Sequence, residues 1–386
     1  MRNVILLGAT GSIGTQTLDI IRLNDDLCLK SFSFGENINK AIEIINEFKP
    51  SIVCCKKEED SIKLSNMYDD IVFYYGREGL IKLSELEFEN PIFVNALVGS
   101  CGLEPTYYAI KSKKDIYLAN KETLVIGGDI IMQEAKTNNV KIVPIDSEHS
   151  AIYQLLDNND ELEIRNLIIT ASGGSLRDLD RSMLDNVTKD QVLNHPNWKM
   201  GEKITVDSAT MMNKGFEVIE AHHLFNVPFE QIKVLIHRNS IVHSMVEFND
   251  FSICAQLASA DMHLPINYAI NGKKHIKCDI IESLNLSRLS NLSFEELDND
   301  RFPLVNVAIE CALKGGIYPT ILNAANEVAV GLFLKGLIKF NDIENIINEE
   351  LNNINYIKYN DCLSIDRILE VDDLVKQNVK NRKVGK

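Results

Sequence analysis

The chain has 386 residues, of which 45% are hydrophobic and 25% charged, so it is long enough for two or three domains with buried cores. Its formal net charge of -15 opposes general binding to nucleic acid or to an anionic membrane surface. No apolar stretch approaches the roughly 20 residues that span a bilayer, and the opening run is strand-like rather than a leader peptide. Eight cysteines without CxxC pairs indicate free thiols in a reducing compartment, so we expect a cytoplasmic protein without disulfides or a zinc site.

Short apolar runs alternate with amphipathic helical patterns in the first part of the chain. The strand-like runs lie at residues 3–8, 29–34, 51–55, 91–97, 115–119 and 140–145, with helical patterns at 13–23 and 38–48. Because these runs are apolar on both faces, the alternation predicts a parallel sheet flanked by helices. We therefore expect a Rossmann-like α/β domain over residues 1–146.

The pattern changes from residue 147 onward. Strand-like runs at 166–174, 233–238, 240–248 and 252–258, interleaved with long helices, predict a central α/β domain with a mixed sheet over 147–278. Residues 279–301 are polar and irregular, which is typical of a linker. Helical periodicity at 305–316, 321–338 and 343–354 predicts a C-terminal α-helical domain over 302–386.

The opening loop reads GATGSIG, with glycines at positions 8, 11 and 14 between a strand and a helix. Glycines let the backbone approach a pyrophosphate, and the helix N-terminus supplies amide donors. A plain strand–helix turn is the alternative, but the place of the loop at the start of an alternating domain favours a cofactor. Its amide donors would come from four consecutive residues, Thr10, Gly11, Ser12 and Ile13.

The same domain leaves the choice of nicotinamide cofactor open. An NAD site places an acid about 20 residues after the glycine loop, and Glu36, in SFGEN, stands close to that position. An NADP site would instead need a basic residue or neutral donors there.

Three further motifs each allow two interpretations. LANKETLV contains Asn120, Lys121 and Glu122 at the end of a strand-like run, where ligands of open α/β sheets bind, or a solvated turn. TASGGSLRD places Ser172 before two glycines, as in an anion-binding loop or an ordinary turn. HPNWKMG contains Trp198, the tip of a mobile lid or a ring packed on the surface.

Residues 206–225 combine an apolar and a polar helical face. Asp207 is placed to cap a helix. The expected core side consists of Met212, Phe216, Ile219 and His223. The other face consists of Thr210, Asn213, Lys214 and Glu217. A solvated face is the ordinary interpretation, but the mixture of amide, ammonium and carboxylate behind Ser208 favours a binding site.

Residues 143–150, VPIDSEHS, bring Asp146 and Glu148 together after a strand. Two residues apart on an extended segment, they would point the same way. Paired carboxylates favour a shared proton or a cation. A third carboxylate from Glu217 would complete an oxygen-rich site suited to magnesium or manganese.

The motifs GATGSIG, LANKETLV, DSEHSAI, TASGG, HPNWKMGEKITVDSATMMNKGFEVIEAHHLF and SIVHSMVEF occur in this order. Together they resemble the 1-deoxy-D-xylulose 5-phosphate reductoisomerase family over nearly the whole chain. The resemblance implies a homodimer that binds NADPH and a divalent metal. It also implies conversion of 1-deoxy-D-xylulose 5-phosphate to 2-C-methyl-D-erythritol 4-phosphate, by skeletal rearrangement and then reduction, in the non-mevalonate isoprenoid pathway.

Carried over by motif, the resemblance assigns roles to individual residues. It implies metal ligation by Asp146, Glu148 and Glu217, which with Lys121 form the expected catalytic set. It implies substrate contacts by Ser147, Glu148, Ser172, His195, Ser208, Asn213, Lys214 and Glu217, with a flap near 193–203 that carries two further contacts, Trp198 and Met200. The NADPH contacts would be Thr10, Gly11, Ser12, Ile13, Gly35, Glu36, Asn37, Asn120, Glu122 and Gly201.

Two departures from the family pattern concern cofactor choice and packing. Glu36 stands where many relatives carry a base or a small residue, so Asn37 and the hydroxyls of Ser31 and Ser33 are further candidates for the 2′-phosphate. ASADMHLPI replaces the frequent PDMR of the family, and we expect His263 to affect packing or the dimer interface rather than the chemistry. The alternative functions are a simple NAD(P)-dependent sugar-phosphate dehydrogenase and a nucleotide-sensing protein without catalysis.

Overall fold

The computed structural model describes residues 1–157, 163–357 and 363–384. The chain divides into two compact units. The first unit comprises residues 1–123, 129–150 and 261–282, and the second comprises residues 124–128, 151–260 and 283–386. Helices α6 (Lys121–Asn138) and α7 (Ser147–Leu156) contribute residues to both units. The expected division into four functional segments stays a prediction.

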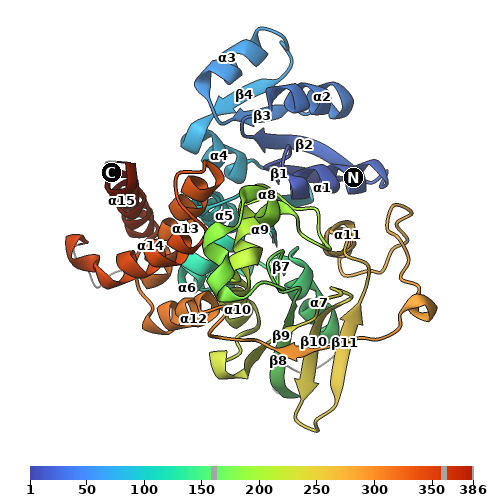
Figure 1. Cartoon of the computed structure of the whole chain (residues 1–386). Helices are drawn as coiled ribbons and strands as arrows, with labels where there is room; N and C mark the ends of the chain where they lie inside the picture. Colours follow the sequence, from blue (N-terminus) through green and yellow to red (C-terminus); the bar gives the residue numbers. More distant parts are fainter. Residues whose placement is uncertain (158–162, 358–362, 385–386) are drawn as a thin grey trace. The chain divides into compact units, whose positions relative to one another are not determined.

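The first unit is built on a parallel sheet of seven strands in the order β4-β3-β2-β1-β5-β6-β7 (Figure 1). Its strands are β1 (Arg2–Leu7), β2 (Leu27–Phe34), β3 (Ile52–Cys55), β4 (Val72–Tyr75), β5 (Pro91–Asn95), β6 (Ile116–Leu118) and β7 (Ile142–Pro144). Residues 4–7 of β1 are fully buried, as expected for a strand covered on both faces. The sequence pattern predicts six of these strands and does not single out β4, whose side chains at the sheet edge are half-buried or exposed.

The direction in which strands are added to this sheet reverses beside β1. The chain runs outward to β4 through α1 (Ser12–Arg22), α2 (Ile38–Phe48) and α3 (Glu58–Ser65). Helix α4 (Gly76–Glu85) then returns it to β5, which pairs with β1, and α5 (Leu103–Lys111) leads on to β6. Ligands of open parallel sheets bind at the carboxyl ends of the strands at such a switch point. The glycine loop after β1 lies at this edge.

Helix α11 (His263–Ile270) joins the first unit from much later in the sequence and packs on α1. His263 Nε2 lies 3.1 Å from Asp19 Oδ2 of α1, and its Nδ1 lies 2.6 Å from Asp261 Oδ1. His263, where this chain departs from the family pattern, therefore makes its contacts within the first unit.

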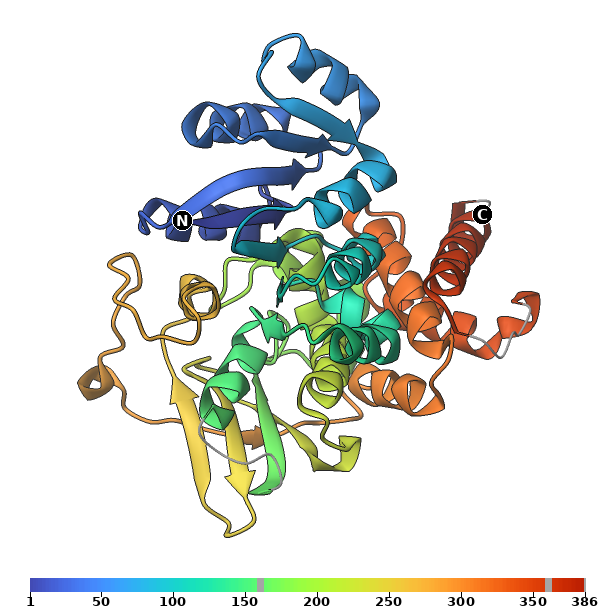
Figure 2. The same ribbon diagram turned by 180° about the vertical axis from the view of Figure 1, so that it is seen from behind.

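The second unit contains a mixed five-stranded sheet in the order β11-β10-β8-β9-β12. Its strands are β8 (Ile164–Ala171), β9 (Ile232–Ile236), β10 (Val242–Phe248), β11 (Ile253–Leu257) and β12 (Glu295–Glu296). Only β8 and β9 run parallel, and Figure 2 shows the long antiparallel hairpin of β10 and β11 in yellow. Leu167 and Ile169 of β8 pack with Val218 and Phe225 of α10 (Met212–Phe225) in one buried cluster.

The second unit also contains α-helices. They are α8 (Lys189–Leu193), α9 (Glu202–Thr210), α10, α12 (Leu304–Lys314), α13 (Tyr318–Leu334), α14 (Asn341–Asn352) and α15 (Ile365–Val384). Helix α13 packs against α14 and α15, and α12 packs so closely on α10 that a Cβ at Gly215 would lie 2.7 Å from Ala308 Cβ. The parallel sheet, the mixed sheet and the C-terminal helices confirm the expected fold class.

None of the helices within the described residues combines the length and the apolar character that a membrane crossing requires. The seven cysteines in the described ranges are free thiols, as expected, and Cys362 lies outside those ranges.

Candidate active site

The glycine loop of the first unit folds as a tight strand-to-helix turn. Gly8 has a φ of +83°, and a Cβ there would lie 2.5 Å from the backbone oxygen of Ala96. A Cβ at Gly14, in the first turn of α1, would lie 2.2 Å from the backbone oxygen of Gly8. Gly11 is the N-cap of α1 and brings no side chain over the helix end. No capping side chain therefore covers the first amides of α1, a geometry that suits an anion, and the cofactor contacts of this loop stay a prediction.

The segment after β2 carries an ion-paired acid. Glu36 Oε1 and Oε2 each lie 2.8 Å from an ammonium group, that of Lys56 and that of Lys57 respectively. Hydrogen bonds from Lys56 and Lys57 lower the pKa of Glu36 to about 2. Asn37 accepts a hydrogen bond from Lys40 N and caps α2, while Gly35 faces open space.

The two serines of β2 are poor candidates for cofactor contacts. Ser31 is fully buried, and Ser33 is 2% exposed. The hydroxyl of Ser33 accepts a hydrogen bond from Gly8 N at 3.0 Å. The expectation that these hydroxyls reach a 2′-phosphate is wrong, because both lie inside the sheet.

The start of α6 is held by Asn120, its N-cap. The Asn120 Oδ1 accepts from Thr123 N, and its amide donates to the backbone oxygens of Leu97 and Gly99 and to Glu122 Oε2. Asn120, Lys121 and Glu122 are all at most 7% exposed, so the solvated-turn interpretation of this motif is wrong.

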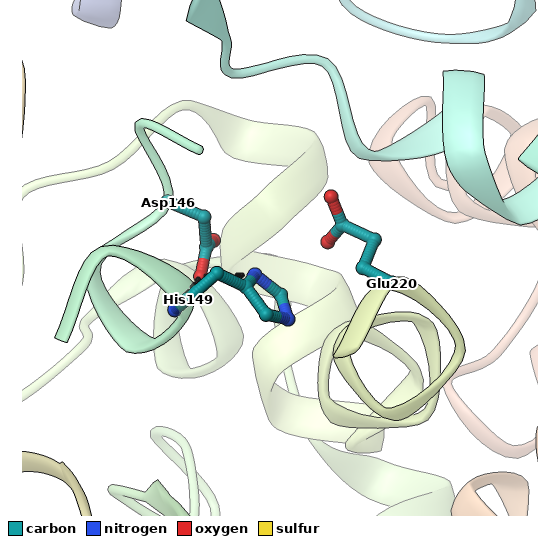
Figure 3. A group of neighbouring side chains, drawn as sticks. All are labelled: Asp146, His149 and Glu220. Atoms are coloured by element: carbon teal, nitrogen blue, oxygen red, sulfur yellow. Dashed lines mark hydrogen bonds and ion pairs between the residues drawn. The ribbon is translucent and has the colours of Figure 1, made fainter. Parts of the chain in front are cut away.

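Asp146 is the acceptor at the start of α7. Its Oδ1 accepts from Glu148 N at 3.2 Å, its Oδ2 pairs with Lys121 Nζ, and His149 Nδ1 lies 3.0 Å from Oδ1. Figure 3 shows Asp146 and His149 in this arrangement. Burial opposes the charge of Asp146, but Lys121 and His149 outweigh it and hold the pKa of this carboxyl well below its usual value.

The local conformation of DSEHS differs from the prediction. Ser147 and Glu148 belong to the first turn of α7, and the Ser147 hydroxyl donates to Glu148 Oε2. The expectation of an extended segment is wrong, because Asp146 caps the helix and thereby begins it directly after β7. The expected convergence of the two acids holds, since a carboxylate oxygen of Asp146 and one of Glu148 lie within 4.8 Å of each other.

In the second unit, residues 206–225 form two helices rather than one. Met211 has a φ of +62° and separates α9 from α10. Asp207 lies inside α9 and does not cap a helix, because its carboxylate instead accepts from Lys203 Nζ and Asn326 Nδ2, each at 2.9 Å. Ser208 is half-buried and lies in the last turn of α9.

The polar face of α10 is buried. Lys214 is 4% exposed and Glu217 is 1% exposed, and Lys214 Nζ pairs with Glu217 Oε2. Asn213 donates to Glu217 Oε1 at 2.5 Å. Met212, Phe216 and Ile219 are buried as expected, whereas His223 is half-buried. The burial of the ammonium and the carboxylate contradicts the solvated-face interpretation and agrees with a binding site.

The loop after β8 contacts both α9 and the segment expected to form the flap. A Cβ at Gly174, whose φ is +74°, would lie 2.7 Å from the backbone oxygen of Ser208. The Oγ of Ser172 lies 2.9 Å from His195 Nε2 and accepts from Gly174 N at 3.1 Å. The structure thus brings Ser172, His195 and Ser208 to one region of the second unit.

The expected flap begins with a turn around His195. His195 Nδ1 accepts from the amides of Asn197 at 3.2 Å and Trp198 at 3.0 Å, so the neutral ring carries its proton on Nε2. Burial and the neighbouring Arg177 lower the pKa of His195 to about 4. Trp198 is half-buried, with its ring centroid 5.8 Å from that of His243, and Met200 is also half-buried. Gly201, exposed, is the N-cap of α9.

Several polar residues of these regions escape the sequence analysis. His149 and Glu220 are 0% and 3% exposed, and Figure 3 draws Glu220 on α10. Arg177 donates to the backbone oxygens of Ser172 and Arg238. The position of Lys56 and Lys57 directly after a predicted strand is the one signal in the sequence that could have pointed to their contact with Glu36.

Comparisons with known proteins agree with the motifs. Residues 4–128 match the family model described as 1-deoxy-D-xylulose 5-phosphate reductoisomerase. Residues 142–225 match the model of the C-terminal domain of that enzyme, and residues 257–378 match the model described as DXP reductoisomerase C-terminal domain.

Relatives of known name cover nearly the whole chain. A protein of Bacillus thuringiensis subsp. konkukian named 1-deoxy-D-xylulose 5-phosphate reductoisomerase 2 is 49% identical over 98% of this chain and 99% of its own. The Macrococcus caseolyticus protein named 1-deoxy-D-xylulose 5-phosphate reductoisomerase is 49% identical over 96% of this chain and 97% of its own.

Solved structures give the same result. A structure of DOX-P reductoisomerase in complex with NADPH, fosmidomycin and magnesium has a TM-score of 0.93 and 37% identity, over 99% of this chain and 98% of its own. The Zymomonas mobilis 1-deoxy-D-xylulose 5-phosphate reductoisomerase in complex with NADPH has a TM-score of 0.89 and 33% identity, over 99% of both chains. The chain belongs to the 1-deoxy-D-xylulose 5-phosphate reductoisomerase family.

Proposed function

We propose that this chain converts 1-deoxy-D-xylulose 5-phosphate to 2-C-methyl-D-erythritol 4-phosphate, by skeletal rearrangement to a branched aldehyde phosphate followed by hydride transfer from NADPH. The observation that carries the proposal is the buried ion pair of Lys214 and Glu217 on α10, with Asn213 beside it. Because a buried ion pair often contributes less stability than apolar residues in its place, a function explains why the pair is retained. The family to which the chain belongs supplies that function.

The divalent metal of the reaction would be held by Asp146, Glu148 and Glu217. Each offers a carboxylate oxygen, and a set made only of oxygens suits magnesium or manganese. Asp146 and Glu217 are both paired with ammonium groups, which supports the presence of ionised carboxylates at these positions. His149 and Glu220, drawn with Asp146 in Figure 3, offer a second set, but its imidazole makes it less suited to magnesium. When bound, the metal would polarise the substrate ketone and stabilise the oxyanion that develops there. A related structure is described as a complex with magnesium.

The phosphate of the substrate would be bound by Ser172, His195, Ser208, Asn213 and Lys214. Lys214 supplies the charge, and His195 donates from Nε2, the nitrogen that now faces Ser172. Because the phosphate is remote from the reacting carbons, its binding can drive closure of the flap with Trp198 and Met200 and position the rest of the substrate. Lys121 and Ser147 would contact the substrate near the reacting carbons.

NADPH would bind along the carboxyl edge of the parallel sheet. The amides of Thr10, Gly11, Ser12 and Ile13 would receive the pyrophosphate, a role supported by the close packing that forces glycine at positions 8 and 14. The Gly11 amide donates to Gly8 O at 3.0 Å, so its contact with the pyrophosphate would be shared with that bond. The remaining contacts would come from Gly35, Glu36, Asn37, Asn120, Glu122 and Gly201. The Asn120 side chain is already hydrogen-bonded within the protein. Asn120 would therefore contact NADPH through its backbone or after a small movement of its side chain.

The protein would act in the cytoplasm as a homodimer. Strand β11 is the edge of the mixed sheet, and Ile253 and Cys254 on it are exposed, as is Phe251 in the hairpin turn. An unpaired edge with exposed apolar side chains is suited to pairing with a second copy. Light scattering of the protein in solution tests this assignment.

Turnover with and without metal tests the proposed reaction. NADPH oxidation should require 1-deoxy-D-xylulose 5-phosphate, stop when EDTA is added, and return with magnesium or manganese. Undiminished hydride transfer in EDTA, or reduction without a rearranged carbon skeleton in the product, would instead identify a simple sugar-phosphate dehydrogenase. Cofactor binding without turnover would identify a nucleotide sensor.

A further inference from the structure

The first unit holds an acid between two lysines at the end of β2. Glu36 bonds Lys56 through one carboxylate oxygen and Lys57 through the other, both at 2.8 Å. All three side chains are more than half exposed, at 63%, 62% and 52% respectively. Exposed ion pairs contribute little to stability, so stability does not explain this arrangement.

The sheet places the three residues together through its register. Strands β2 and β3 run parallel, with Phe34 beside Cys55, so the residues that follow them leave the sheet at the same edge. Strand β1 pairs with the other side of β2, and the glycine loop follows it at that edge. The order along the edge is therefore the glycine loop, then Glu36, then the two lysines.

This order matches the parts of a dinucleotide. The pyrophosphate binds at the glycine loop, and the adenosine ribose lies over the end of the next strand, where an acid binds the hydroxyls of NAD. Such an acid alone would repel the 2′-phosphate of NADPH. Here Lys56 and Lys57 outnumber it. Gly35 borders open space, since a Cβ there would meet no atom within 4 Å.

We infer that Lys56 and Lys57 bind the 2′-phosphate of NADPH, and that Glu36 is their counter-ion in the free protein. The inference rests on the proposed use of NADPH. The phosphate replaces the Glu36 carboxylate as the shared partner of the two ammonium groups. The first turn of α3 adds three acids, Glu58, Glu59 and Asp60, which weaken the positive electrostatic potential around the two lysines. Recognition of the phosphate therefore comes from direct contact with the two ammonium groups.

Binding of two small probes tests the inference without turnover. Adenosine 2′,5′-bisphosphate carries the 2′-phosphate and AMP lacks it, and calorimetry gives the dissociation constant of each. The Lys56→Ala/Lys57→Ala variant should bind the bisphosphate roughly tenfold or more weakly, because contacts to charged groups are lost. Its affinity for AMP should stay within about twofold, since the two lysines lie outside the 5′-phosphate site. The Glu36→Gln variant should bind the bisphosphate more tightly.

A matched control removes the same charge elsewhere in the unit. Lys40 on α2 and Lys63 on α3 do not belong to the group of Glu36 and its two lysines. The Lys40→Ala/Lys63→Ala variant should therefore change the affinities for the bisphosphate and for AMP alike and only slightly. Equal loss of both probes in the Lys56→Ala/Lys57→Ala variant, no loss at all, or weaker bisphosphate binding by Glu36→Gln would overturn the inference. The proposed reaction can fail separately. Selective binding through the lysines without turnover would refute only the reaction, and turnover with an unchanged preference for NADPH over NADH in the lysine variant would refute only this inference.

Discussion

In the second unit, His195 Nε2 lies 2.9 Å from Ser172 Oγ, within hydrogen-bond distance. The other ring nitrogen, Nδ1, accepts two backbone amides, those of Asn197 and Trp198. A protonated ring would have to donate from Nδ1 and would lose both bonds. The start of the flap is therefore built on a neutral histidine.

This arrangement predicts a loss of stability on mild acidification. The pKa of His195 is about 4 in the folded chain, below the usual value near 6.5 that holds when it is unfolded. The unfolded state therefore takes up the proton first. The stabilisation is complete above about pH 6.5 and is lost as the pH falls toward 4. Urea unfolding of the wild type and of His195→Asn at several pH values isolates this effect from the other histidines, and the difference between them should shrink between pH 7 and 5. A difference that does not vary with pH would contradict it.

The glycine loop predicts a sharp contrast between two Gly→Ala substitutions. Gly14→Ala should destabilise the protein and weaken NADPH binding, because its Cβ would lie 2.2 Å from a backbone oxygen. Gly331→Ala, inside α13 with no atom near its Cβ, should instead stabilise by roughly 0.5–1 kcal/mol. Thermal unfolding and NADPH titration of both variants test this contrast, and similar behaviour of the two would refute the close approach at Gly14.

The buried pair on α10 predicts coupled effects on stability and substrate binding. Lys214→Gln removes the ammonium group that pairs with the buried Glu217 Oε2, which should cost about 3–5 kcal/mol. It should also raise the KM for 1-deoxy-D-xylulose 5-phosphate if Lys214 binds the phosphate. Adding Glu217→Gln should recover part of the lost stability, because the buried carboxylate that lost the Lys214 ammonium is then neutral.

Lys189→Gln is the control for this pair. Its side chain is 40% exposed and pairs with Glu202 at 2.9 Å, so its loss should change stability by less than about 1 kcal/mol. A wild-type KM in Lys214→Gln would refute the phosphate role, and simple additivity in the double variant would refute the coupling.

The sequence predicts the strands of the parallel sheet better than it predicts where helices begin and end. Apolar periodicity marks six strands of the parallel sheet, because burial on both faces leaves a direct trace in the sequence. The break at Met211 leaves none, because a methionine rarely adopts positive φ and nothing in SATMMNKG marks the turn. The helix that begins at Ser147 is likewise hidden, since DSEHS suits an extended end and a capped helix equally well.

For the proposed site residues, the sequence likewise predicts their identity better than their partners. Motifs identify Asp146, Lys214 and Glu217 by their chemical type, but their partners depend on tertiary packing. Lys56 and Lys57 meet Glu36 only because β2 and β3 are neighbours in the sheet. Asp207 meets Asn326 across more than a hundred residues, a pairing that no local pattern contains.

That last pairing predicts different outcomes for two asparagines on one helix. Asn326 of α13 donates to Asp207 Oδ1 at 2.9 Å, and Asp207, 2% exposed, directly precedes Ser208. Asn326→Ala should cost about 1.5–3 kcal/mol, because it removes a hydrogen bond to a buried charge. If Ser208 binds the substrate phosphate as proposed, the substitution should also raise the substrate KM more than it changes kcat, since Asp207 directly precedes Ser208 on α9.

Asn323, one turn earlier on the same helix, is the matched control. It is fully buried, and within the described part of the chain neither its amide nitrogen nor its oxygen has a hydrogen-bond partner. Asn323→Ala should therefore cost less than Asn326→Ala, because it removes polar atoms that make no bond. Urea unfolding and steady-state kinetics of both variants distinguish the two roles. Equal losses would mean that α13 responds only to lost volume, and the link from Asn326 through Asp207 to the phosphate site would then have to be abandoned.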